Sequence, residues 1–138
     1  MNKMFLDKKA IDSHRGYFLI FNYDEFKDIS HYPKITSAHD VNRLYKTFTE
    51  LGFTVRVYHN LTSEETRKII DLYSWADLAN CDMIGVAIIT RGDCDGVLYT
   101  RDSQLDISDY TEPFKLNSTL IGKPKVLHIS LYLFAFLR

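Results

Sequence analysis

The residues best suited to chemistry lie at the end of one long apolar run. Residues 83–90 are almost entirely apolar, and Arg91, Gly92 and then Asp93-Cys94-Asp95 follow them directly. A nearby cation lowers the pKa of a thiol, so Cys94 close to Arg91 has one of the features of a nucleophile. A nucleophilic thiol also requires a base, and Arg91 is a fixed cation that takes up no proton at neutral pH. Since no histidine is close in the sequence, we expect Cys94 to be an ordinary loop residue.

The other candidate ligands form no metal-binding pattern. Cys81 and Cys94 lack the spacing of a metal site. The histidines are scattered along the chain, at positions 14, 31, 39, 59 and 128. We therefore predict neither a metal site nor a cofactor. His128 lies in an apolar stretch, which favours a hydrogen-bonded histidine in the core.

The composition is typical of an ordinary globular domain. The chain has 138 residues, of which 46% are hydrophobic and 25% charged, and its formal net charge is −1. This length suits one domain, and the charge gives no reason to expect nucleic acid or an anionic membrane as a partner. The N-terminal residues contain no apolar stretch of the length that a signal peptide needs. We therefore expect a cytoplasmic protein.

The apolar patterns predict alternating strands and helices. Helices are expected to begin near Ser37 and after Thr62, with a short helix near residues 109–116. The expected extended segments are 17–22, 53–59, 83–90, a short hairpin at 96–102 and a last strand starting at Val126. This β-α-β-α-β-(α)-β order predicts an α/β fold, with a mostly parallel sheet and helices on both faces.

Spacings of three and four residues assign the buried faces of the two longer helices. The apolar face of the first helix consists of Val41, Leu44, Tyr45, Phe48 and Leu51. That of the second consists of Ile69, Leu72, Tyr73 and Ala76. Thr62 and Glu65 have the spacing of a capping box at the start of the second helix.

Several segments, taken in order, resemble those of one protease family. They are the run from Gly16 to Asn22, the stretch from Asp40 to Leu44 in the first helix, the turn Asn60-Leu61-Thr62, and Gly122-Lys123-Pro124-Lys125. Together they resemble the large catalytic subunit of a caspase, over roughly residues 15–129. The resemblance implies a three-layer caspase-like fold limited to the large-subunit half. It also implies a short N-terminal tail, 1–14, before a domain at 15–138.

The positions that carry caspase catalysis hold other residues in this chain. The Ser-His-Gly turn of the family corresponds to Thr90-Arg91-Gly92. Arg91 therefore stands where the resemblance places the catalytic histidine, and Gly92 is retained at the oxyanion position. The family's Gln-Ala-Cys-Arg/Gln-Gly motif falls on residues 130–134, which puts Tyr132 at the nucleophile position.

Two substrate-pocket positions are altered as well. The resemblance places one of them at Ser130. An arginine that binds the aspartate of caspase substrates corresponds to Lys34, which keeps the charge but loses the bidentate fork of a guanidinium. The resemblance therefore implies that this chain is not an active enzyme.

Two functions remain open at this stage. One is an inactive caspase homologue that modulates apoptotic or related caspase activity. It would pair with a caspase or caspase-like chain through an open sheet edge near Val126 to Leu137. The alternative is a truncated or mis-spliced form of a cysteine-type endopeptidase that acts in proteolysis and apoptosis. The apolar C-terminal stretch is too short to span a membrane, which needs about 20 residues.

Overall fold

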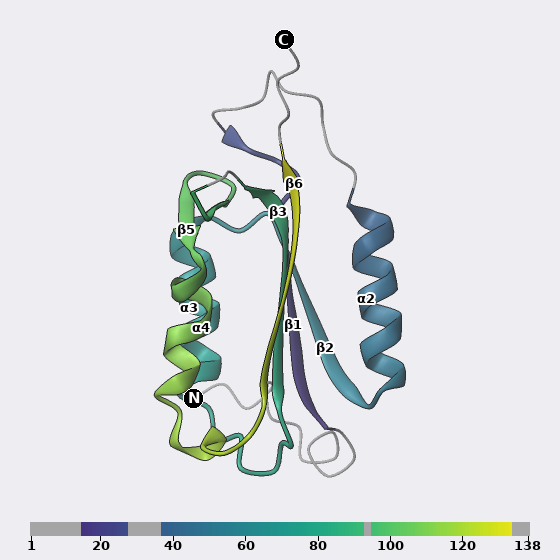
Figure 1. Cartoon of the computed structure of the whole chain (residues 1–138), viewed down its shortest axis with the longest axis vertical. Helices are drawn as coiled ribbons and strands as arrows, with labels where there is room; N and C mark the ends of the chain where they lie inside the picture. The colour runs from purple at the N-terminus through teal and green to yellow at the C-terminus, as the bar shows by residue number, and fades with distance from the viewer. Residues whose placement is uncertain (1–14, 28–36, 93–94, 134–138) are drawn as a thin grey trace.

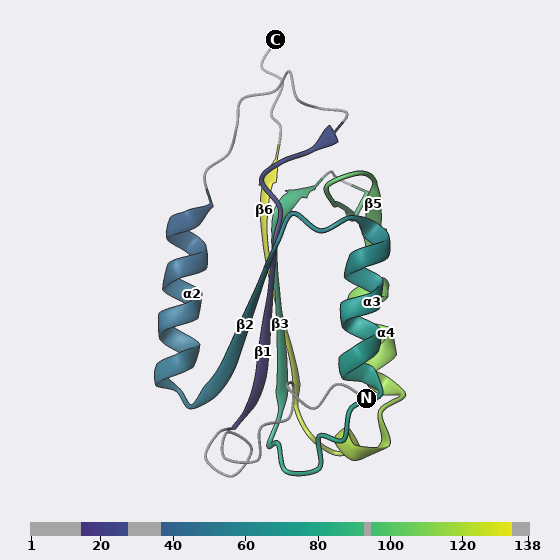
Figure 2. The same cartoon turned by 180° about the vertical axis from the view of Figure 1, so that it is seen from behind.

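Three layers make up the described part of the molecule, which comprises residues 15–27, 37–92 and 95–133 of a computed structural model. A sheet of six strands forms the middle layer. One helix covers one face of this sheet and two helices cover the other, as the two opposite views show (Figures 1 and 2). The predicted α/β fold with helices on both faces is confirmed.

Parallel strands form most of the sheet. The order is β2-β1-β3, with β6 on the free side of β3 and the short strands β4 and β5 joined antiparallel at the end of β3. All pairs among β1, β2, β3 and β6 are parallel. The strand bounds are β1 Gly16–Asn22, β2 Phe53–His59, β3 Ile84–Gly92, β4 Val97–Tyr99, β5 Gln104–Asp106 and β6 Lys125–Leu133.

Helix α2, Ala38–Glu50, covers one face of the sheet, and α3, Ser63–Ser74, and α4, Ile107–Lys115, cover the other. A 3-10 turn, η3, Ser118–Leu120, precedes β6. The predicted capping box of α3 is confirmed. The Thr62 hydroxyl accepts a hydrogen bond from the Glu65 amide at 3.1 Å, and the Glu65 carboxylate accepts one from the Thr62 amide at 2.9 Å.

The predicted helix faces were partly wrong. On α2, Val41 is buried, but Tyr45 and Leu51 are about half exposed. On α3, Ile70 is buried in place of Leu72, which is 45% exposed. Tyr45, Leu51 and Leu72 lie at the margins of the apolar helix faces. A residue at such a margin is buried only where another element packs against it, and no described element does so here.

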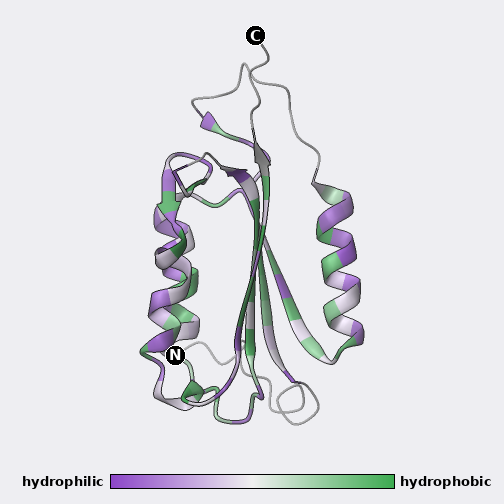
Figure 3. Ribbon diagram, in the orientation of Figure 1, coloured by the Kyte–Doolittle hydropathy of each residue, from purple (hydrophilic) through white to green (hydrophobic). Residues whose placement is uncertain are grey.

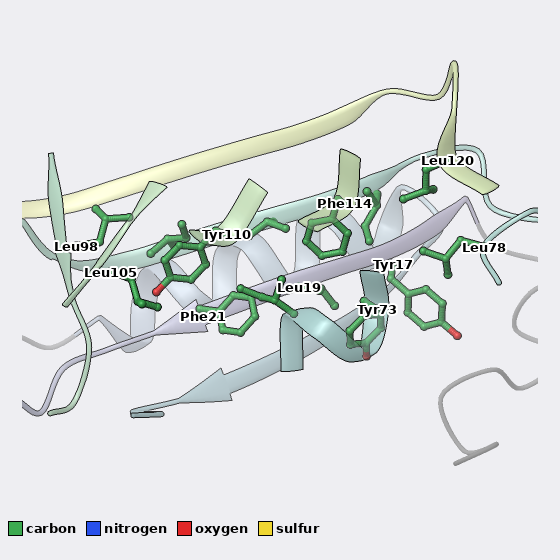
Figure 4. Packing of buried hydrophobic residues seen from close by; sticks show 14 of the residues in the cluster. Tyr17, Leu19, Phe21, Tyr73, Leu78, Leu98, Leu105, Tyr110, Phe114 and Leu120 are labelled. Atoms are coloured by element: carbon green, nitrogen blue, oxygen red, sulfur yellow. The ribbon is translucent and has the colours of Figure 1, made fainter. Parts of the chain in front are cut away.

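Two clusters of side chains, one on each face of the sheet, form the core. The smaller cluster packs β1 and β3 against α2, and Phe18 stacks on Phe48 with ring centroids 3.8 Å apart. The larger cluster lies between the sheet and α3 and α4, and Figure 4 shows Leu19, Phe21 and Tyr110 within it. The central strands are coloured as hydrophobic, whereas much of the helical surface is hydrophilic (Figure 3).

Strand β6 is less covered than the other parallel strands. It pairs with β3 along its whole length, and no described strand pairs with its other edge. Val126 and Leu127, whose side chains point to opposite faces, are 43% and 37% exposed. His128, predicted to lie in the core, is exposed. The prediction failed because an apolar strand at the edge of a sheet is only partly covered.

Candidate functional site

The ends of β3 and β6 bring together the two positions that the sequence analysis placed at the centre of the site. The parallel register runs from Ile84 beside Lys125 to Gly92 beside Leu133, and it pairs Arg91 with Tyr132. Neighbouring strands lie about 4.8 Å apart, so these two backbone positions are adjacent. Strand β3 continues through Gly92, two residues beyond its predicted end, because β6 supplies a pairing partner up to that point.

Arg91 is buried, with 3% of its surface exposed. Its guanidinium lies over the ring of Phe26, 5.6 Å from the ring centroid. Phe26 in turn meets Tyr99 of β4 edge to face, with centroids 6.5 Å apart. A cation over an aromatic face is stabilised by the ring quadrupole, most strongly when water is excluded. The site therefore holds a buried cation packed against the ring of Phe26, which Tyr99 supports in turn.

Asn60 fixes the segment that carries Phe26. Its side-chain oxygen accepts hydrogen bonds from the amides of Asp24 and Glu25, at 2.8 and 3.0 Å. Its side-chain nitrogen donates to the Asp24 carboxylate at 2.8 Å. Asn60 has a positive φ of 52°, a conformation that asparagine tolerates better than most residues. The turn after β2 thereby holds the segment after β1 in place beneath Arg91.

Gly92 lies in a crowded position at the end of β3. It is buried and pairs with Leu98 of β4 and Leu133 of β6. A Cβ atom here would approach a methyl group of Leu131 to 2.9 Å and the Val97 carbonyl oxygen to 3.2 Å. Both distances are shorter than ordinary contacts, so close packing favours glycine at this position, and a larger residue would push the Leu131 side chain aside.

Ser130 lies on β6, beside Ile89 of β3, and is partly exposed. It lines a hollow of about 260 Å³ between β6 and α2, together with Asp40, Arg43 and His128 among others. The structure therefore places Ser130 next to α2. Lys34 and Cys94 lie outside the described residues, as does Leu137, and the Tyr132 side chain is not described.

Cys81 is 3% exposed, and burial raises the pKa of its thiol. Both features oppose thiolate formation, so Cys81 is not a candidate nucleophile. Within residues 15–27, 37–92 and 95–133, no three His, Cys, Asp or Glu side chains gather as metal ligands would. In the same residues, no helix has the length and apolarity to cross a membrane.

A family model described as the caspase domain matches residues 15–134. The chain belongs to the caspase family. The match continues four residues past Ser130, through the end of β6. The register of Arg91 with Tyr132 therefore lies wholly within the caspase-like region.

Relatives in animals have similar sequences over most of this chain. Identity is 35% over 118 residues to Caspase-1 of Spodoptera frugiperda, covering 84% of this chain and 39% of that protein. It is 33% over 118 residues to Caspase-6 of Gallus gallus, covering 83% and 38%. It is 35% over 127 residues to Caspase-8 of Mus musculus, covering 83% and 26%. The chain thus spans about two fifths, or less, of the length of these relatives.

Solved caspase structures have the same fold. The crystal structure of Caspase-1 from Spodoptera frugiperda matches with a TM-score of 0.79 at 36% identity, over 86% of this chain and 47% of that one. The structure of pro-sf-caspase-1 matches with a TM-score of 0.83 at 31% identity, over 96% and 59%. The predicted caspase-like fold is confirmed.

Sequence reasoning did not find the contact between Phe26 and Arg91. Phe26 lies in an irregular segment, and no periodic pattern marks it. The turn at Asn60 was recognised, but not the hydrogen bonds to Asp24 and Glu25 that give it a role in the site. Contacts between segments far apart in sequence, such as Phe26 and Arg91, leave no pattern in the neighbouring residues from which they could be predicted.

Proposed function

We propose that this caspase-family chain is a non-catalytic homologue that modulates an active caspase by pairing with it. The observation that carries the proposal concerns Arg91. It is a buried permanent cation, and it is the register partner of Tyr132 on the neighbouring strand. Cysteine proteolysis needs a thiolate and a group that takes up its proton. A guanidinium takes up no proton at neutral pH, and a phenol does not replace a thiol. Loss of a nucleophile typically lowers the rate by several orders of magnitude.

The surface that supports pairing is the outer edge of β6. This edge has no strand partner among the described residues, and Val126, Leu127 and Leu131 are each more than a third exposed. A strand edge with free amides and carbonyls and few charges favours addition of a strand from another chain. We propose a caspase chain as the partner, because its sheet has the same architecture and its strands could continue this sheet at the β6 edge.

Catalytic silence is tested with purified protein and fluorogenic peptides that end in aspartate. We expect no turnover above the buffer rate from the wild-type chain. The matched variant is Cys94→Ala, which removes the thiol closest in sequence to Arg91. Turnover that is present in the wild-type chain and lost in Cys94→Ala would refute the proposal.

Pairing is tested by co-expression with an effector-type caspase. We expect co-purification and a changed rate of cleavage after aspartate by that partner. Val126→Lys places a charge on the exposed edge strand and should weaken both effects. Thr49→Lys adds the same charge to the exposed surface of α2 and serves as the control. If the chain neither co-purifies nor alters the partner's rate, the modulating function is wrong.

A second function is supported by Gly92 and by the extent of the family match. Gly92 is retained at the oxyanion position that the resemblance assigns, and the caspase model matches through residue 134. These two observations fit a form of a cysteine-type endopeptidase. Turnover in the peptide assay by a longer product of the same gene, lost when its own catalytic cysteine is changed, would establish that alternative.

A further inference from the structure

An apolar groove runs between α3 and α4, along residues 67–75 and 108–116, and Arg91 is not among the residues that line it. It has a volume of about 490 Å³. Trp75 and Leu116, the residues that end the two helices, line it and are 81% and 82% exposed. Large apolar side chains gathered at one place on a surface mark a site where another segment binds. The groove plays no part in the proposed function.

Acidic groups surround this apolar surface. Asp71, Asp109 and Glu112 line the groove, whereas Arg67 is the basic residue in the lining. Arg67 lies 3.6 Å from Asp109, and Lys115 lies 2.6 Å from Glu112, so Asp71 is the lining acid outside these two ion pairs. The C-terminal end of α3 adds negative partial charge, and no basic residue in its last turn offsets it. The groove is therefore suited to an apolar segment flanked by cations.

Residues 1–14 of the same chain, which lie outside the described residues, contain such a segment. Its apolar centre is Met4-Phe5-Leu6, with Lys3 before it and Lys8-Lys9 after it. Three lysines and one aspartate lie within residues 3–9, whereas the groove offers Asp71 in addition to the two acids that Arg67 and Lys115 already pair.

The start of the described chain lies within reach of the groove. The Arg15 carbonyl accepts a hydrogen bond from the Asp82 amide at 2.6 Å, and Trp75 is seven residues before Asp82. Seven residues span at most about 25 Å, whereas the nine or ten extended residues between Arg15 and Leu6 or Phe5 reach roughly 30–35 Å. Figure 4 shows Tyr17 and Leu78, which follow Arg15 and Trp75 closely in sequence, at the same end of the core.

We propose that residues 3–9 bind the groove between α3 and α4 of their own chain, with Phe5 and Leu6 against Trp75 and Leu116. Tethering gives such a segment an effective concentration on the order of millimolar, so a contact with a dissociation constant well below a millimolar is largely formed. The lysines on either side then face the acidic lining.

Trp75 is the only tryptophan in the chain, so its fluorescence reports on the groove directly. The experiment compares acrylamide quenching in the full wild-type chain and in Phe5→Ser/Leu6→Ser. We expect the quenching constant to rise about twofold or more in the variant, because the tethered ligand is lost. Ile11→Ser changes an apolar residue of the same N-terminal segment outside the binding region and should quench like the wild type. Asp71→Lys, at an exposed position in the groove, should quench like the double variant.

A synthetic peptide of residues 1–14 provides the reverse test. Added to Phe5→Ser/Leu6→Ser, it should restore shielding of Trp75, and it should fail to do so when Asp71→Lys is also present. Equal quenching of the wild type and the double variant would overturn the proposal. Shielding that survives the double variant and grows with protein concentration would overturn it too, because a second copy would then be the occupant.

Discussion

Arg91 and Tyr132 are register partners on the adjacent parallel strands β3 and β6. They are 41 positions apart in sequence, and the fold places their backbones on the same rung of the sheet. The resemblance to caspases assigned one of them to the catalytic base and the other to the nucleophile. The register is what those two roles require, since a base and a nucleophile must lie within hydrogen-bond reach. We propose that this chain keeps the backbone arrangement of such a pair with two side chains that do not supply its chemistry.

The first prediction concerns a thiol placed beside Arg91. In a Cys94→Ser background, Tyr132→Cys should give a thiol with a pKa lowered by about one unit or more, because an opposite charge nearby favours the thiolate. The measurement is the pH dependence of alkylation by iodoacetamide. Cys81 should stay unreactive, since it is buried. The matched variant adds Arg91→Met, which should return the pKa toward its ordinary value. Identical pH profiles with and without Arg91 would contradict the prediction.

The second prediction concerns the packing of Arg91 on Phe26. Arg91→Met and Phe26→Leu should each destabilise the fold. The double variant should lose less than the sum, with a coupling energy of about 0.5–2 kcal/mol. The measurement is the free energy of unfolding in urea. Phe48, which packs on the α2 face of the sheet, provides the control. Phe48→Leu combined with Arg91→Met should be additive, and additivity at Phe26 as well would rule out the contact as a source of stability.

The third prediction concerns the hydrogen bonds between Asn60 and Asp24. Asn60→Asp removes the donor to the Asp24 carboxylate and places two acids together, so it should cost about 1–2 kcal/mol of stability. Exchanging the two residues, with Asn60→Asp and Asp24→Asn together, should recover most of this loss, because one donor and one carboxylate again face each other. Thermal unfolding of the single and double variants tests this. A double variant no more stable than Asn60→Asp would contradict it.

The fourth prediction concerns alkaline pH. Burial raises the pKa of Tyr23 to about 12, and it also raises the pKa values of Tyr73 and Tyr110 above the ordinary value of 10.0. The unfolded chain therefore loses these protons at a lower pH than the folded chain. Their contribution to stability is complete below about pH 10 and falls as the pH rises toward 12, by about 1.4 kcal/mol per pH unit for each tyrosine.

Thermal unfolding followed by circular dichroism across this pH range measures the slope. Tyr110→Phe removes one of the three groups, while Tyr23 keeps its 2.7 Å hydrogen bond to Thr66. The variant should lose stability less steeply above about pH 10. An unchanged slope would mean that Tyr110 ionises equally in the folded and unfolded chains.

Local patterns predicted the elements well and the environment of the site poorly. Strand β2 begins at Phe53 and ends at His59 as expected, because alternating β-branched residues are a local signal. The end of β3 was placed two residues early, since its continuation depends on a partner strand that starts at Lys125. His128 was assigned to the core because an apolar run does not reveal whether its strand lies at an edge. The burial of Arg91 likewise depends on Phe26, which is 65 residues earlier in the chain.

The pairing of β6 with β3 also bears on how the chain folds. Every rung between these strands joins residues 41 positions apart, and β4, β5 and α4 intervene. The β1–β3 pairs join residues even further apart, 67 positions, so loop length does not set the order. The order follows from synthesis, because the segments of β1, β2 and β3 are made before β6 and can pair first. Strand β3, buried along its whole length in the final structure, would then have one open edge until β6 arrives. That interval is when the nascent chain is most prone to aggregate, and mutations that delay β6 should lower the yield of folded protein more than its final stability.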